Sequence, residues 1–153
     1  MNQENLNYII STDSGCDLSI DVCKENKNYA MTCAWAMMID YQKIAMLIGS
    51  QSITGQNLSI NQQVGVSALA DGQQEIAKII GTNHSNEIDK FATISYTNKD
   101  NMILINNAKV VMECVVESIQ NLDGDLLVFL KVNNFEELKD VDYLDGYDPK
   151  NYM

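Results

Sequence analysis

The segment Tyr29-Ala30-Met31-Thr32-Cys33-Ala34-Trp35 opens a series of elements whose order decides the fold. An apolar run over residues 43–49 follows, and then the hydroxyl-bearing turn Ser50-Gln51-Ser52-Ile53-Thr54. A second apolar run over residues 64–69 leads through a helical pattern to Asp89-Lys90-Phe91. Short apolar runs bounded by turn residues are typical of buried strands. The series therefore predicts buried strands, a short helix after the hydroxyls, and a second helix before the lysine.

The rest of the chain is dominated by strand and turn signals. Asp123-Gly124 is typical of a hairpin and separates β-rich runs at residues 109–119 and 125–133. The other predicted elements are strands at residues 8–12, 18–23, 31–38, 44–48, 64–69, 92–96 and 102–105, and helices at residues 54–61 and 71–81. These strands and two short helices predict a mainly β protein, a closed or split β-barrel rather than a doubly wound α/β sheet. We expect one domain over residues 1–153, with a peripheral tail from about residue 134.

The charge of the chain argues against two classes of partner. The net charge is -11 and the sequence pI is about 4.3, so the surface repels nucleic-acid phosphates and anionic membranes. No apolar run reaches the roughly 18 residues of a spanning helix. The first residues lack the basic and apolar regions of a signal peptide. We therefore expect a cytoplasmic protein that binds neither nucleic acid nor membrane.

The cysteines do not predict a metal site. Cys16, Cys23, Cys33 and Cys114 form no C-x-x-C pair, and His84 is the single histidine. Cys33 and Cys114 lie in apolar runs and are expected to behave as small hydrophobic residues. Cys16 and Cys23 could pair, although reduced thiols are the expectation for a cytoplasmic chain.

Three segments could bind a ligand. Ser50, Ser52 and Thr54 open a helix, where hydroxyls and free N–H groups suit a mononucleotide phosphate; the alternative is an ordinary N-cap. Lys90 could balance such a phosphate, or it could be a solvated lysine beside Asp89. The small residues at 32–36 would let a flat ring approach the strand backbone.

Two further residues have alternative interpretations. Trp35 could be a core residue or could border a flat ring bound at this segment. His84 could be solvated in its polar loop or could contact a substrate or an exposed ring. The chain contains neither G-x-G-x-x-G nor G-x-x-x-x-G-K-[ST], so neither common phosphate-binding loop is present.

The order of these residues resembles that of the flavin reductase-like family of FMN-binding split barrels. The family's Asn-Ala-Met-Thr-x-x-Trp-like segment is similar to residues 29–35, although Tyr29 replaces the Asn. Its Val-x-Val-x-x-Leu strand is similar to residues 64–69, and its Asp-Lys-Phe to residues 89–91. A departure is Asp40-Tyr41-Gln42-Lys43, which stands where the family commonly has prolines.

The resemblance implies a flavin reductase-like or flavoredoxin-like oxidoreductase, usually a homodimer, with FMN bound non-covalently. Electrons would pass from NAD(P)H or a redox protein through FMN to an acceptor, and no side chain need act as acid or base. Carried over, the ring would lie by Met31, Thr32, Cys33, Ala34, Trp35 and Ala36, and the phosphate by Ser50, Gln51, Ser52, Thr54 and Lys90. His84 would contact the substrate. The alternatives are a non-catalytic protein that binds FMN or another small ligand, and a protein–protein module that has lost the cofactor.

Overall fold

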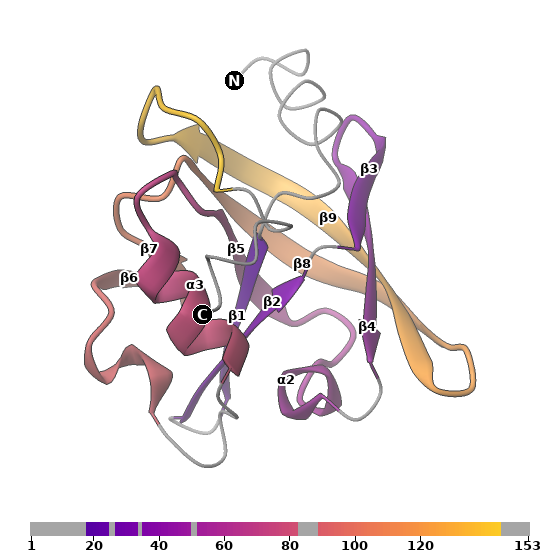
Figure 1. The fold of residues 1–153 in the computed structure, drawn as a ribbon. Helices are drawn as coiled ribbons and strands as arrows, with labels where there is room; N and C mark the ends of the chain where they lie inside the picture. Colours follow the sequence, from indigo (N-terminus) through magenta and orange to yellow (C-terminus); the bar gives the residue numbers. More distant parts are fainter. Residues whose placement is uncertain (1–17, 25–26, 34, 50–51, 83–88, 145–153) are drawn as a thin grey trace.

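One strongly twisted antiparallel sheet organises the chain (Figure 1). The structure is a computed structural model and describes residues 18–24, 27–33, 35–49, 52–82 and 89–144. Within these residues the elements are β1 (Leu18–Lys24), β2 (Lys27–Cys33), β3 (Ala36–Asp40), β4 (Lys43–Gly49), α2 (Ile53–Gln56), β5 (Gln63–Ala68), α3 (Gln74–Thr82), the 3-10 helix η1 (Lys90–Ala92), β6 (Tyr96–Lys99), β7 (Met102–Ile105), β8 (Val110–Asn121) and β9 (Asp125–Glu137). The strand order is β3-β4-β9-β8-β5-β1-β7-β6, with β2 paired to β1. The prediction of a mainly β protein with short helices is confirmed.

Strand β5 lies at the centre of the fold, where the sheet folds over itself. Its residues 64–68 are all buried, because β1 and β8 flank it and β7 crosses it. At the crossing, a Cβ on Gly65 would lie 1.9 Å from the carbonyl oxygen of Ile103. The buried hydroxyl of Ser67 accepts a hydrogen bond from the Ile105 N–H at 3.0 Å. A glycine and a serine thus allow two strands to meet without a regular ladder.

The long hairpin of β8 and β9 forms the other half of the sheet, and its turn follows the predicted signal. Asp123 and Gly124 both have positive φ, 57° and 128°, which suits a tight hairpin turn. Strand β4 pairs along β9, and β3 pairs with β4 at the edge of the sheet. In Figure 1 this hairpin runs the length of the molecule, with β4 crossing beside it.

Two hydrophobic clusters fill the fold. The first packs between the sheet halves and includes Ile44, Met46, Val66 and Met112. Cys33 and Cys114 form no disulfide with each other and are buried in this first cluster, as expected for small hydrophobic residues. The second lies beneath α3 and consists of the buried residues Ala30, Leu69, Ala77, Ile80, Phe91, Ile94, Ile103, Ile105 and Leu144. Figure 1 shows α3 in front of β1 and β2, and its buried residues share the second cluster with Ile103 and Ile105 of β7.

Three predicted elements differ in the structure. Residues 31–38 are not one buried strand, because β2 ends at Cys33 and β3 begins at Ala36 on the exposed sheet edge. The predicted helix over residues 54–61 ends at Gln56, since Asn57 leaves the helical region with φ -101° and ψ 6°. The predicted strand over residues 92–96 is replaced by η1 and an irregular segment, which bury Phe91 and Ile94 under α3.

Several helices and strands also begin or end at other residues than the sequence predicts. Helix α3 begins at Gln74 and continues through Gly81 to Thr82. Asp71, the expected N-cap, still accepts a hydrogen bond from the Gln74 side chain at 3.1 Å. After the predicted strand end at residue 133, β9 continues to Glu137, and Leu144 is buried in the second cluster. The predicted strand at residues 8–12 lies outside the described residues.

Candidate functional site

The junction between β2 and β3 is held against β4 by backbone hydrogen bonds. The Leu47 N–H donates to the Trp35 carbonyl at 2.8 Å. The Cys33 thiol donates to the same carbonyl at 3.5 Å and to the Leu47 carbonyl at 3.7 Å. Cys33 is buried, and Ala36 is half-buried against the first cluster. The described residues of the predicted ring segment therefore belong to two strands, β2 and β3, rather than to one continuous strand.

The hydroxyl-rich turn lies directly against this segment. The Ser52 hydroxyl donates to the Met31 sulfur, with Oγ and Sδ 3.3 Å apart. The same Oγ accepts from the Gly55 N–H at 3.2 Å, so Ser52 is the N-cap of α2. The structure thus brings together two predicted parts of the site, 21 residues apart in the sequence. Of the two interpretations of Ser52, the structure shows the ordinary N-cap, and phosphate binding stays a prediction.

Trp35 and Thr54 are exposed to opposite degrees. The Trp35 side chain is 71% exposed, so its interpretation as a core residue is wrong. Thr54 is 2% exposed and is enclosed by its surroundings. In this conformation, solvent and ligands have access to Trp35, whereas Thr54 is covered.

Lys90 is buried and bonded to backbone, so its interpretation as a solvated lysine is wrong. Only 4% of the residue is exposed. Its ammonium donates to the Ala30 carbonyl at 2.7 Å and to the Ile80 carbonyl at 2.6 Å. The first carbonyl belongs to β2 and the second to the last turns of α3. Lys90 therefore connects helix α3 to the strand that carries Met31.

The charge state of Lys90 reflects this burial. Loss of hydration lowers the pKa of Lys90 from its ordinary value of 10.5 to about 8, and the negative charge of Asp21 opposes the shift. Asp21 is itself fully buried, on β1 opposite Ala30. A lysine and a carboxylate thus share the space beneath α3.

Several predicted site residues lie outside the described residues. They are Ala34, Ser50, Gln51 and His84, together with the side chain of Thr32. Among the residues that are described, no group of three or more His, Cys, Asp or Glu side chains could hold a metal ion. The described part of the chain also contains no helix that is long and apolar enough to cross a membrane.

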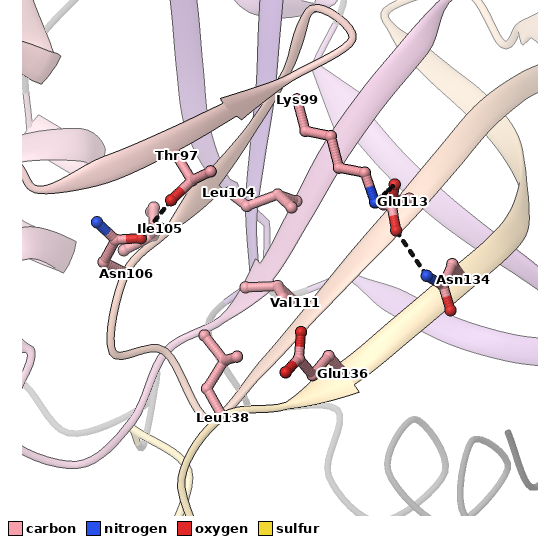
Figure 2. Close-up of a pocket in the computed structure, with 10 residues that line it drawn as sticks. All are labelled: Thr97, Lys99, Leu104, Ile105, Asn106, Val111, Glu113, Asn134, Glu136 and Leu138. Atoms are coloured by element: carbon pink, nitrogen blue, oxygen red, sulfur yellow. Dashed lines mark hydrogen bonds and ion pairs between the residues drawn. The ribbon is translucent and has the colours of Figure 1, made fainter.

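A separate hollow of about 230 Å³ opens beside the β6–β7 hairpin and the β8–β9 strands (Figure 2). Its polar groups bind one another: Lys99 pairs with Glu113 at 3.1 Å, and the Asn134 amide donates to Glu113 at 2.8 Å. Ligand pockets are usually about 300–1,000 Å³. The hollow is smaller than that range, and none of the predicted flavin-site residues lines it. We therefore do not place the cofactor there.

The contacts that sequence reasoning missed are made by backbone carbonyls. The carbonyls of Ala30 and Ile80 accept hydrogen bonds from the Lys90 ammonium group, and the Leu47 carbonyl accepts one from the Cys33 thiol. Any residue type offers such an acceptor, so no sequence signal identifies them. Met31, Ser52 and Lys90 were all candidates from the sequence, but the contact between Ser52 and Met31 was not predicted.

The solved structures similar to this chain include several flavoproteins. An NADH:FAD oxidoreductase from Streptomyces globisporus matches with a TM-score of 0.77 at 16% identity, over 84% of this chain and 79% of that chain. An FMN-binding protein from Thermus thermophilus matches with a TM-score of 0.73 at 14% identity, over 80% and 70%. A flavoredoxin from Methanosarcina acetivorans matches with a TM-score of 0.74 at 12% identity, over 89% and 75%. At these identities, the likeness establishes the barrel fold.

Sequence comparison establishes the family. Among curated proteins, no sequence matches this chain. The family model described as the flavin reductase like domain, in contrast, matches residues 6–150, nearly the whole chain. The chain therefore belongs to the flavin reductase-like family of flavin-binding oxidoreductases.

Proposed function

We propose that this oxidoreductase holds FMN non-covalently and moves electrons from NAD(P)H, or from a redox protein, through FMN to an acceptor. The observation that carries the proposal is the contact between Ser52 and Met31, which joins the hydroxyl-rich turn to the ring segment. A single-domain, cytoplasmic protein fits this role. We assign the ring to Met31, Thr32, Cys33, Ala34, Trp35 and Ala36, and the phosphate to Ser50, Gln51 and Ser52, and we leave out Thr54 because its side chain is covered.

The described residues fit an isoalloxazine ring. Cys33 and Ala36 have little bulk, so a flat ring can approach the corner between β2 and β3. The exposed Trp35 indole offers an aromatic surface beside this corner, and aromatic rings stack favourably at offset geometry. Bound FMN would supply the electron-transfer chemistry that amino-acid side chains lack. The protein's residues would bind the ring, orient it and shield part of it from water.

We further propose that the protein is a homodimer and that β3 lies in its interface. Trp35, Met37, Ile39 and Tyr41 alternate along this edge of the sheet and are between 47% and 71% exposed. We call these four residues the β3 stripe. Strand edges are usually protected by Lys, Pro or charged residues, whereas Asp40 is the one charged residue in β3. In a chain of net charge -11, an apolar stripe lets two copies meet without opposing their acidic groups.

Reduction of bound FMN by NAD(P)H distinguishes an enzyme from a protein that only carries the flavin. The test is to record the visible absorbance of the purified protein with added FMN, with added FAD, and then with NADH or NADPH under anaerobic conditions. We expect protein-bound FMN whose absorbance bleaches when the reduced nucleotide is added. Bound flavin that stays oxidised would leave a redox protein as the donor, or a passive flavin-binding protein.

The cofactor assignment has its own contrary outcome. A protein that binds neither FMN nor FAD at micromolar concentration would refute the proposed site. Preferential binding of FAD would be consistent with an oxidoreductase and would overturn the choice of FMN.

His84 is proposed to contact the nicotinamide. A His84→Ala variant with raised KM for NADH and unchanged FMN affinity would support that role.

A further inference from the structure

We propose that Lys90 is a positioning residue, which fixes the strand behind the flavin ring rather than binding the flavin phosphate. The inference rests on the proposed function, because it concerns how the same site is built. It departs from the role that the resemblance implies for the lysine of Asp-Lys-Phe. Three observations support it: the backbone carbonyls that accept hydrogen bonds from the ammonium group, the burial of the residue, and the negative charge of Asp21 nearby.

The ammonium group is directed at backbone on two sides. Its hydrogen bonds to Ala30 and Ile80 are short, 2.7 Å and 2.6 Å. The Ile80 carbonyl lies near the C-terminal end of α3, where carbonyls lack helical partners and a cation is favourable. Ala30 immediately precedes Met31 in β2. Lys90 thus connects the end of a helix to the backbone of the ring segment.

The position of Lys90 is unfavourable for a phosphate. Its neighbours Ala30, Ile80 and Phe91 are members of the buried cluster beneath α3. Placing a phosphate dianion there would remove it from water at a large free-energy cost. The fully buried Asp21 already supplies a negative charge that interacts with Lys90. A second anion at this place would therefore meet repulsion from Asp21.

The contacts predict how loss of the Lys90 side chain would affect flavin binding. Lys90 holds Ala30, the next residue is Met31, and Met31 accepts the hydrogen bond of Ser52. A shift of β2 would therefore disturb the ring segment and the adjoining turn together. A lysine that binds the flavin phosphate would behave differently, because its substitution would weaken only the binding of the phosphate.

The test compares FMN with riboflavin, which has the same ring and no phosphate. Dissociation constants for both flavins are measured with the wild-type protein, Lys90→Met and the control Lys131→Met. Lys131 is an exposed lysine of β9, so its substitution changes the net charge equally. We expect Lys90→Met to weaken both flavins by the same factor, on the order of tenfold, the equivalent of one charge-assisted hydrogen bond. Lys131→Met should leave both constants unchanged.

A positioning role also predicts a spectroscopic signature and a rescue. At saturating flavin, Lys90→Met should alter the visible circular dichroism of the bound ring, whereas Lys90→Arg, which keeps charge and donors, should restore part of the affinity for both flavins. If Lys90→Met does not fold, Lys90→Gln allows the same comparison. Weaker binding of FMN with unchanged riboflavin would overturn the inference and make Lys90 a phosphate ligand. Wild-type protein that binds neither flavin would instead refute the proposed function itself.

Discussion

Gly65→Ala tests the crossing of β5 and β7, on which the whole barrel depends. The added Cβ would lie 1.9 Å from the Ile103 carbonyl oxygen and 2.8 Å from its carbon. Real Cβ atoms keep at least 3.0 Å from such atoms, so the strands must separate by 3.0 - 1.9 = 1.1 Å or more. The obstacle is backbone, so no side-chain rotation can relieve it.

The cost of this substitution can be worked from the contacts. Overpacking a core costs about 1–3 kcal/mol and occasionally more. Separation of the strands also endangers the bond from the Ile105 N–H to the Ser67 hydroxyl, which contributes about 1 kcal/mol with a further penalty if its groups stay buried. We therefore expect the free energy of unfolding to fall by about 3–5 kcal/mol. For a protein of this size the melting temperature should fall by roughly 6–20 °C.

The assay is urea and thermal unfolding followed by circular dichroism, with Gly55→Ala as the matched control. A Cβ at Gly55 would lie 2.9 Å from the Ile48 Cγ2 methyl, a side-chain group that has to shift by only about 0.1 Å to reach the same 3.0 Å limit. Alanine is also a better helix former than glycine by about 1 kcal/mol, so Gly55→Ala should stay within about 1 kcal/mol of the wild type. If Gly65→Ala were equally mild, the close approach of β5 and β7 would be refuted.

Three further predictions concern the site. Ser52→Ala removes the N-cap of α2 and the contact with Met31, so the unfolding free energy should fall by about 1 kcal/mol and FMN should bind more weakly; melting curves with and without FMN check both, and unchanged curves would contradict the cap. Trp35→Ser should hardly change monomer stability, because the side chain is 71% exposed, but sedimentation should show weaker dimers; an unchanged dimer would exclude the β3 stripe from the interface. Since burial lowers the pKa of Lys90 from 10.5 to about 8, the unfolded chain binds more protons between these pH values, so this residue's contribution to stability rises with pH across that window. Urea unfolding of wild type and Lys90→Met at about pH 8 and about pH 10 tests the last prediction, which fails if both proteins change equally.

Much of the fold follows from local patterns in the sequence. The β8–β9 hairpin is predicted by Asp123-Gly124 between two β-rich runs, because positive φ at both positions suits Asp and Gly. Strand β5 is predicted by its apolar run, but the reason for its Gly65 is the carbonyl of Ile103, 38 residues away. Non-local contacts of this kind have no periodicity, so the crossing of β5 and β7 could not be predicted.

The error at residues 31–38 has a similar cause. Their apolar content is typical of a buried strand, yet Trp35 and Met37 are exposed on an edge of the sheet. Composition records that a residue is apolar and does not record what covers it. If the β3 stripe lies between two copies, the apolar pattern was a correct sign of burial, but burial in an assembly rather than in one chain.

Charge alone leaves the role of Lys90 open, because the sequence does not show where its side chain lies. In a chain with 10 basic and 21 acidic residues, an isolated lysine in a loop is attractive as the counter-ion of a phosphate. The structure instead places this charge beneath α3, where two carbonyls and Asp21 surround it. Burial of a lysine is unfavourable unless its donors are satisfied, so these bonds must form whenever the chain folds with Lys90 charged. If the flavin ring lies where we propose, Lys90 would order the strand beside the ring without touching the phosphate. The comparison of FMN with riboflavin distinguishes this explanation from direct binding.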